Sequence, residues 1–217
     1  MARALLDGAK LQIFGDILMM LVEQTTVPTL ALPITEFKDH LRMGTGFSDD
    51  ALQDDVLESY LRSAMAAIEA RTGKILIAHE FLWSLTAWRA LAAQAFPVAP
   101  VSAISMFRML DRTGAVTVID AGRYALQKDD HRPRLMAVGS SLPSIPIGGS
   151  AEVIFEAGFG AAWGDLPADM AHAVLMLAAH FYENRDVAGT GGEAMPYGVT
   201  SLIERYRTVR ILGGASL

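Results

Sequence analysis

The stretch EARTGKILIAHEFLWSL, residues 69–85, contains the change from helical to β patterning that decides the fold class. Before Gly73, apolar side chains recur at every fourth position, and glycine is a residue type that commonly ends helices. This spacing predicts one helical stripe, formed by Leu52, Val56, Tyr60, Ala64 and Ile68. After Gly73 apolar positions alternate, which predicts a strand with one apolar face made of Ile75, Ile77, Phe81, Trp83 and Leu85. We therefore expect an α+β fold.

The region from residue 75 to about residue 158 consists of short β-rich runs separated by turn residues. The run AISMFRMLDRTGAVTVID, residues 103–120, predicts a hairpin that turns between Asp111 and Gly114. Three further strands are predicted by RYALQ, RLMAV and AEVIFEAGFG. We interpret this region as a small antiparallel sheet.

Helical patterns precede and follow the β-rich region. The run LPITEFKDHLRMG, residues 32–44, predicts a short helix, and GDLPADMAHAVLMLAAHFYENR, residues 164–185, predicts a long one capped by Asp165. The long helix is apolar nearly all round, which indicates burial on more than one side. A last short helix is predicted to open with Ser201 and Glu204 as a capping box, after the glycine-rich hinge VAGTGGEA.

These patterns predict a helical bundle with a small antiparallel β-sheet insertion and a flexible C-terminal arm. The expected parts are an N-terminal arm (1–32), a helical part (33–74), the β-rich insertion (75–160), a long core helix (161–187), and a hinge with a C-terminal arm (188–217).

Composition narrows the classes of function. Apolar residues make up 52% of the chain and charged residues 19%, which favours buried contacts between subunits. The net charge of −6 argues against broad adhesion to nucleic acid or to an anionic membrane. The absence of cysteine excludes disulfides and thiolate chemistry. Asp7, Lys10 and Asp16 interrupt the apolar N-terminal segment, so we expect neither a membrane span nor a signal peptide.

None of the sequence motifs that could bind a metal ion or a phosphate group is complete enough to indicate catalysis. His172 and His180 lie eight residues apart, about 12 Å along a helix, which is too far for one metal ion. His180 and Glu183 have the spacing of half a di-metal site, but no second copy of that motif follows. The run AGTGGE lacks the Lys-Ser/Thr of a phosphate loop. We expect no enzyme, no cofactor and no metal, while a small metal-dependent or hydrolytic enzyme stays open as an alternative because active sites assemble from distant residues.

The stretch HFYENRDVAGTGGEAMPYG, residues 180–198, joins large contact side chains to a run of glycines. In order and spacing, this stretch and several other phrases resemble the head–tail connector (adaptor) proteins of long-tailed phages and phage-derived gene transfer agents. The phrases are the acidic helix ending in EARTGK, the AGFG…LP entry into the long helix, HFYENRD, and YGVTSLIERYR. The resemblance covers about residues 33–210.

The resemblance implies a non-enzymatic homo-oligomeric ring, commonly of twelve copies, in the neck of a phage-like particle assembled in the bacterial cytoplasm. Helices would form the ring body below the portal protein, and the C-terminal segment would reach the portal. Stopper or other tail proteins would bind the ring, and DNA would pass through its lumen without sequence-specific binding. A tail-completion protein of the same particle is the nearest alternative.

The residues expected at a portal or subunit interface are large aromatic and charged side chains, the types that dominate interface energetics. They are Phe181, Tyr182, Glu183, Arg185, Tyr197, Arg205, Tyr206 and Arg207. We hypothesise that the terminal arginines pair with acids of a neighbouring subunit or of the portal. A solvated basic helix is the alternative interpretation.

Overall fold

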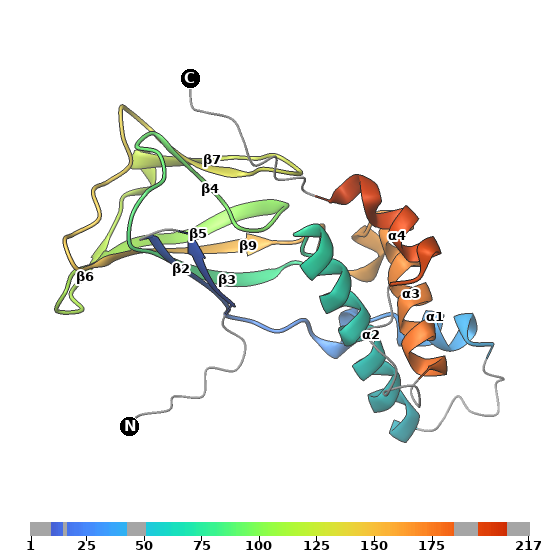
Figure 1. The fold of residues 1–217 in the computed structure, drawn as a ribbon. Coiled ribbons are helices and arrows are strands. Elements are labelled where there is room, and N and C mark those ends of the chain that lie inside the picture. Colours follow the sequence, from blue (N-terminus) through green and yellow to red (C-terminus); the bar gives the residue numbers. More distant parts are fainter. Residues whose placement is uncertain (1–9, 15–16, 43–50, 185–194, 208–217) are drawn as a thin grey trace. The chain divides into compact units, whose positions relative to one another are not determined.

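The computed structural model describes residues 10–14, 17–42, 51–184 and 195–207, and the chain forms two compact units. Unit 1 combines Met1–Val27 with Ile77–Ala161, and unit 2 combines Pro28–Leu76 with Ala162–Leu217. Both units are therefore built from segments distant in sequence. Figure 1 shows the strands of unit 1 and the helices of unit 2.

Unit 1 contains a six-stranded antiparallel sheet with the order β1-β2-β3-β9-β5-β6. Its strands are β1 (Lys10–Phe14), β2 (Ile17–Glu23), β3 (His79–Leu85), β5 (Val101–Leu110), β6 (Val116–Val118) and β9 (Ser150–Ala157). The central strands β3 and β9 pair along seven residues. In both strands buried and half-buried residues alternate, so one sheet face is fully packed and the other is partly exposed.

A second antiparallel sheet of three strands packs on the buried face of the first. Its order is β4-β8-β7, with β4 (Ala93–Ala95), β7 (Tyr124–Gln127) and β8 (Arg134–Ala137). Phe96, directly after β4, lies with its ring centroid 5.2 Å from that of Trp83 and 4.8 Å from that of Phe155. Trp83, Phe155 and Phe107 are fully buried, so this aromatic cluster forms the core of the β sandwich.

Gly158 allows a close approach of two chain segments after β9. Its φ of +140° is a conformation that side-chain-bearing residues rarely adopt, and a Cβ there would lie 2.3 Å from the Cα of Ala78. This approach sets the bridge between Ile77 and Gly160. The glycine is therefore required where β3 begins and β9 ends.

Unit 2 is helical. It contains α1 (Ile34–His40), α2 (Ala51–Thr72), α3 (Ala168–Glu183) and α4 (Tyr197–Ile203), with short 3-10 turns at Thr29–Ala31, Trp163–Asp165 and Glu204–Tyr206. Helices α2 and α3 pack together, and α1 and α4 pack against α3. In the described ranges, no helix is both long enough and apolar enough to cross a membrane.

The predicted stripe on α2 is correct at its C-terminal end and wrong at its N-terminal end. Ala64 and Ile68 are buried, Tyr60 is half-buried and Val56 is 46% exposed. Each step of four residues overshoots the helical period of 3.6, so a strict four-residue repeat drifts around the helix. The face that packs instead consists of Leu57, Leu61, Ala64, Met65 and Ile68.

The α+β class is correct, but the predicted helical bundle with a small β insertion is wrong. Six strands form one sheet and three form another, so the β part is a sandwich rather than an insertion in a bundle. The first two strands, at Lys10–Phe14 and Ile17–Glu23, lie in the segment expected to be an N-terminal arm. Their apolar run has no alternation, and pairing with β3, some 60 residues away, cannot be seen in a local pattern.

The predicted flexible C-terminal arm is also wrong for its described part. Helix α4 and the following 3-10 turn pack on α3, and Val199, Ile203 and Tyr206 are buried. The helix begins at Tyr197 after Pro196, so Ser201 lies inside it and does not form the predicted capping box. The predicted hinge, VAGTGGEA, lies outside the described residues.

Candidate interaction surfaces

Helix α4 is fixed to α3 by apolar contacts and by one polar cluster. Val199 and Ile203 are fully buried on the side of α4 that faces the rest of unit 2. In the 3-10 turn that follows α4, Glu204–Tyr206, the hydroxyl of Tyr206 donates a hydrogen bond of 2.7 Å to Oδ1 of Asp169, in the first turn of α3. We call α4 and this turn, residues 197–207, the C-terminal element. The contact spans 37 positions in sequence and ties the C-terminal element to the long helix.

Arg205 completes this cluster. Its Nη2 lies 2.9 Å from Oδ2 of Asp169, also donates to the hydroxyl oxygen of Tyr206, and its guanidinium lies 4.7 Å from the centre of the Tyr206 ring. Burial raises the pKa of Tyr206; the hydrogen bond from Arg205 opposes this rise and the one to Asp169 adds to it. The hydrogen bond to Tyr206 raises the pKa of Arg205. Arg205 and Tyr206, two of the predicted interface residues, therefore make contacts within unit 2.

The other predicted interface residues differ in exposure. Tyr197 is 87% exposed at the start of α4. Arg207 is exposed and lies 2.8 Å from Glu204, three residues earlier. Tyr197 and Arg207 lie at the two ends of residues 197–207, and both are exposed to a partner.

At the end of α3, Glu183 is exposed, while Phe181 and Tyr182 are half-buried. The ring of Tyr182 meets that of Tyr60 on α2 edge to face, with centroids 5.7 Å apart. Arg185 lies outside the described residues. The predicted set is thus brought partly to one end of α3 and partly to α4, and whether it binds a partner remains a prediction.

The histidines of unit 2 are arranged for packing. The rings of His172 and His40 meet edge to face at 6.2 Å. Nδ1 of His180 accepts a hydrogen bond of 3.0 Å from Nδ2 of Asn184, near the end of α3. Over the described parts of the chain, no group of three or more His, Asp or Glu side chains has the geometry to hold a metal ion.

The six-stranded sheet has a second face that the described strands of unit 1 leave uncovered. Strand pairing places Val22, Leu82, Ile154 and Met106 in one row across β2, β3, β9 and β5. In the next row Glu152 and Arg108 form an ion pair with an Nη2 to Oε2 distance of 2.7 Å. Val118 and Val116, on β6, extend this apolar face and are 63% and 53% exposed. We call it the open face.

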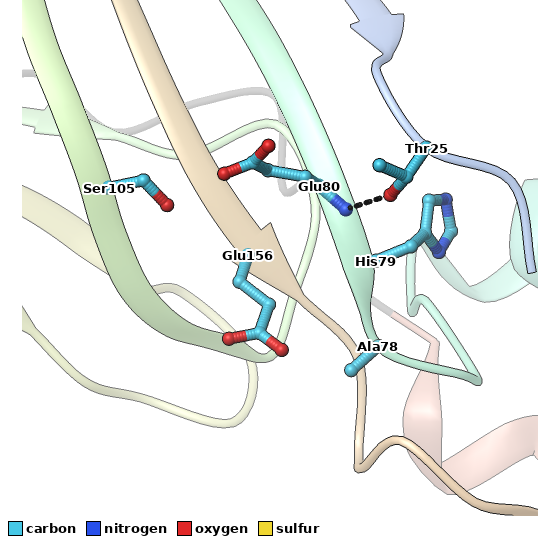
Figure 2. Close-up of a pocket in the computed structure, with 6 residues that line it drawn as sticks. All are labelled: Thr25, Ala78, His79, Glu80, Ser105 and Glu156. Atoms are coloured by element: carbon cyan, nitrogen blue, oxygen red, sulfur yellow. Dashed lines mark hydrogen bonds between the residues drawn. The ribbon is translucent and has the colours of Figure 1, made fainter.

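Two glutamates are register partners at one end of the open face, and Figure 2 shows their carboxylates pointing away from each other. Glu80 and Glu156 are paired across β3 and β9, and they line a hollow of about 320 Å³ together with Thr25, Ala78, His79 and Ser105 (Figure 2). Ser102 donates to Oε2 of Glu156 at 3.1 Å. The carboxylate of Glu80 has no ion-pair partner among the described residues, although its backbone N–H donates to Thr25 at 3.0 Å.

The hollow does not assemble a nucleophile with a base. Strand alternation puts the side chain of His79 on the packed face of β3, opposite to Glu80. Its Nδ1 is 2.9 Å from the carbonyl oxygen of Ile77, and its Nε2 lies 4.0 Å from Glu23. Sequence reasoning missed this site, although the outward positions of HEF and FEA in two alternating strands are the signal that marks the two glutamates.

Comparison with known proteins gives one consistent result. No family model matches the sequence, and no curated protein matches it. A chain in the neck of an empty gene transfer agent particle, computed with C6 symmetry, is 53% identical over 90% of this chain and 98% of that chain, with a TM-score of 0.82. A chain of a native gene transfer agent virion is 52% identical over 89% of this chain and 98% of that chain, with a TM-score of 0.79. A third, from the neck of a native particle computed with C12 symmetry, is 49% identical over 90% of this chain and 98% of that chain, with a TM-score of 0.77.

Proposed function

This chain belongs to a family of neck proteins of gene transfer agent particles, and from this membership we propose that it is the structural head–tail adaptor of such a particle. The observation that carries the proposal is the identity of about half of all residues with neck chains, over nine tenths of the sequence. Because the match covers about nine tenths of the chain, it includes residues of both units.

In this proposal the protein forms a homo-oligomeric ring of twelve copies below the portal protein. The ring joins the DNA-filled capsid to stopper or other tail proteins. Related necks were computed with C6 and C12 symmetry, which supports a ring of copies. The chain would be assembled into particles in the bacterial cytoplasm.

The acidic balance of the chain supports a DNA conduit. At a net charge of −6, a ring of such chains repels phosphate groups on average, so that duplex DNA slides during packaging and ejection instead of adhering. The role is non-enzymatic and needs no cofactor.

We place the portal contact on the exposed residues of the C-terminal element, Tyr197 and Arg207, together with the end of α3 at Phe181–Glu183 and Arg185.

Deletion of the gene in the producing organism tests this proposal. Electron microscopy of the particles, with tail-protein content measured alongside, should reveal DNA-containing or leaked heads without tails, together with free tails. Normal tailed particles would refute the adaptor role. Binding of the purified chain to the tail tube but not to the portal would instead assign it as the tail-completion protein.

A further inference from the structure

The open face of the six-stranded sheet carries apolar side chains that the described strands of unit 1 do not cover. Bulky apolar side chains lie on this face on both sides of the Glu152–Arg108 pair, and they come from five strands, namely Val22, Leu82, Ile154, Met106, Val116 and Val118. Met106, Val116 and Val118 are each more than a third exposed. Contiguous apolar areas of this kind mark protein contacts more often than free surface.

The pair of glutamates at the end of this face indicates a positively charged partner. Like charges placed directly opposite on neighbouring strands destabilise a sheet. Arg108, the basic residue of the same face, is already engaged by Glu152. A cation supplied from outside the unit would neutralise part of the negative charge that Glu80 and Glu156 bring to this end of the face.

The opposite side of the same sandwich offers such a cation on a flat surface. The outward side of the three-stranded sheet, which we call the outer face, carries Arg134 together with small or unbranched side chains at Ala93, Ala95, Ala125, Gln127 and Met136. Arg134 is exposed and its side chain has no ion-pair partner among the described residues. Alanines allow the bulky side chains of an approaching sheet to come to the usual packing distance of about 10 Å.

A closed ring of identical chains requires two different and complementary surfaces on each copy. The open face and the outer face are the two sides of one sandwich: the first has bulky apolar side chains with Glu80 and Glu156 at one end, and the second has small or unbranched side chains with Arg134. We propose that the open face of one copy packs on the outer face of the next copy around the ring, with Glu80 and Glu156 against Arg134. The inference rests on the ring of the proposed function and adds the surfaces that close it.

Charge exchange tests the contact in assembled particles. Glu80→Lys and Arg134→Glu should each lower the fraction of tailed particles about tenfold or more, because each puts like charges together across the contact. The double variant places Lys against Glu at every contact and should recover much of the loss. Wild-type numbers of tailed particles in both single variants would overturn the proposal, as would a double variant no better than the worse single one. Unchanged melting temperatures of the purified variants separate an assembly defect from a folding defect.

Crosslinking tests the geometry independently, and the natural absence of cysteine means that no native thiol of this chain can react. A chain with Met106→Cys and Ala125→Cys, treated in particles with a short bismaleimide, should give a ladder of dimers, trimers and larger species. Each single variant should stay monomeric. A dimer from Met106→Cys alone would mean that open faces pair with each other, and a product with the mass of another neck protein would mean a different occupant; either overturns the inference.

The same experiment separates the two proposals. Necks that contain this chain in ring stoichiometry but give no ladder would refute the head-to-tail contact and leave the adaptor role intact. Particles whose necks lack the chain altogether would refute both.

Discussion

Two residues that were expected to bind another protein in the particle instead contact a residue of their own unit. Tyr206 and Arg205 were predicted as interface anchors because their types suit interfaces, yet both bind Asp169 in their own unit. A side-chain type can be read from the sequence, but a partner 37 positions away cannot. Tyr197 and Arg207, by contrast, have the exposure that an interface residue needs.

Replacing Tyr206 by Phe tests the polar cluster. The change leaves the ring in place but removes the donor to Asp169, so we expect a loss of about 1 kcal/mol in the free energy of unfolding, measured by urea denaturation. Because folding raises the pKa of Tyr206 above its ordinary value of 10.0, its unfolded form ionises first. The wild type should therefore lose stability as the pH rises above about 10, more steeply than the variant. Tyr197→Phe, at an exposed position, should match the wild type; an equal loss in both variants would contradict the assignment.

At the scale of elements, local patterns predicted most of the strands and helices but not their assembly. The alternation in residues 75–85 and 151–160 and the turn at 111–114 correspond to β3, β9 and the β5–β6 hairpin. The bundle was wrong because β1 and β2 lengthen the sheet through pairing that only the folded chain reveals. The open face was missed for the same reason, since its row of apolar side chains comes from four separate strands.

The junction of β3 and β9 gives a prediction at this scale. Gly158→Val should destabilise unit 1 by roughly 2–4 kcal/mol, because it combines a strained φ with a clash against the backbone of Ala78. Gly164→Ala is the matched control, as a Cβ there meets nothing within 4 Å. Thermal unfolding followed by circular dichroism should show a lower midpoint for the first variant and an unchanged one for the second. Equal midpoints would mean that the junction relaxes without cost.

For the whole molecule, the composition now has a structural interpretation. A chain with 52% apolar and 19% charged residues builds one β unit and one helical unit, and it still leaves an apolar sheet face uncovered by the described strands of unit 1. The sequence predicted subunit contacts from this composition, while the location that we propose for them is argued from strand register. In the proposed ring each unit has its own role, because the sandwich joins copies to one another and the C-terminal element of the helical unit reaches the portal.

Charge reversal at the C-terminal element tests these separate roles. Within the described ranges, Arg207 pairs only with the nearby Glu204 at the surface, a contact worth little to stability, whereas Arg205 is bound to Asp169. Arg207→Glu should therefore leave the melting temperature unchanged but lower the fraction of tailed particles counted by electron microscopy. Arg205→Glu should lower both, because it also breaks the cluster with Tyr206. Because the sandwich contact is untouched, cysteine pairs at Met106 and Ala125 should still crosslink any rings that form in the Arg207→Glu background. Tailed particles at wild-type numbers in this variant would show that the portal contact lies elsewhere.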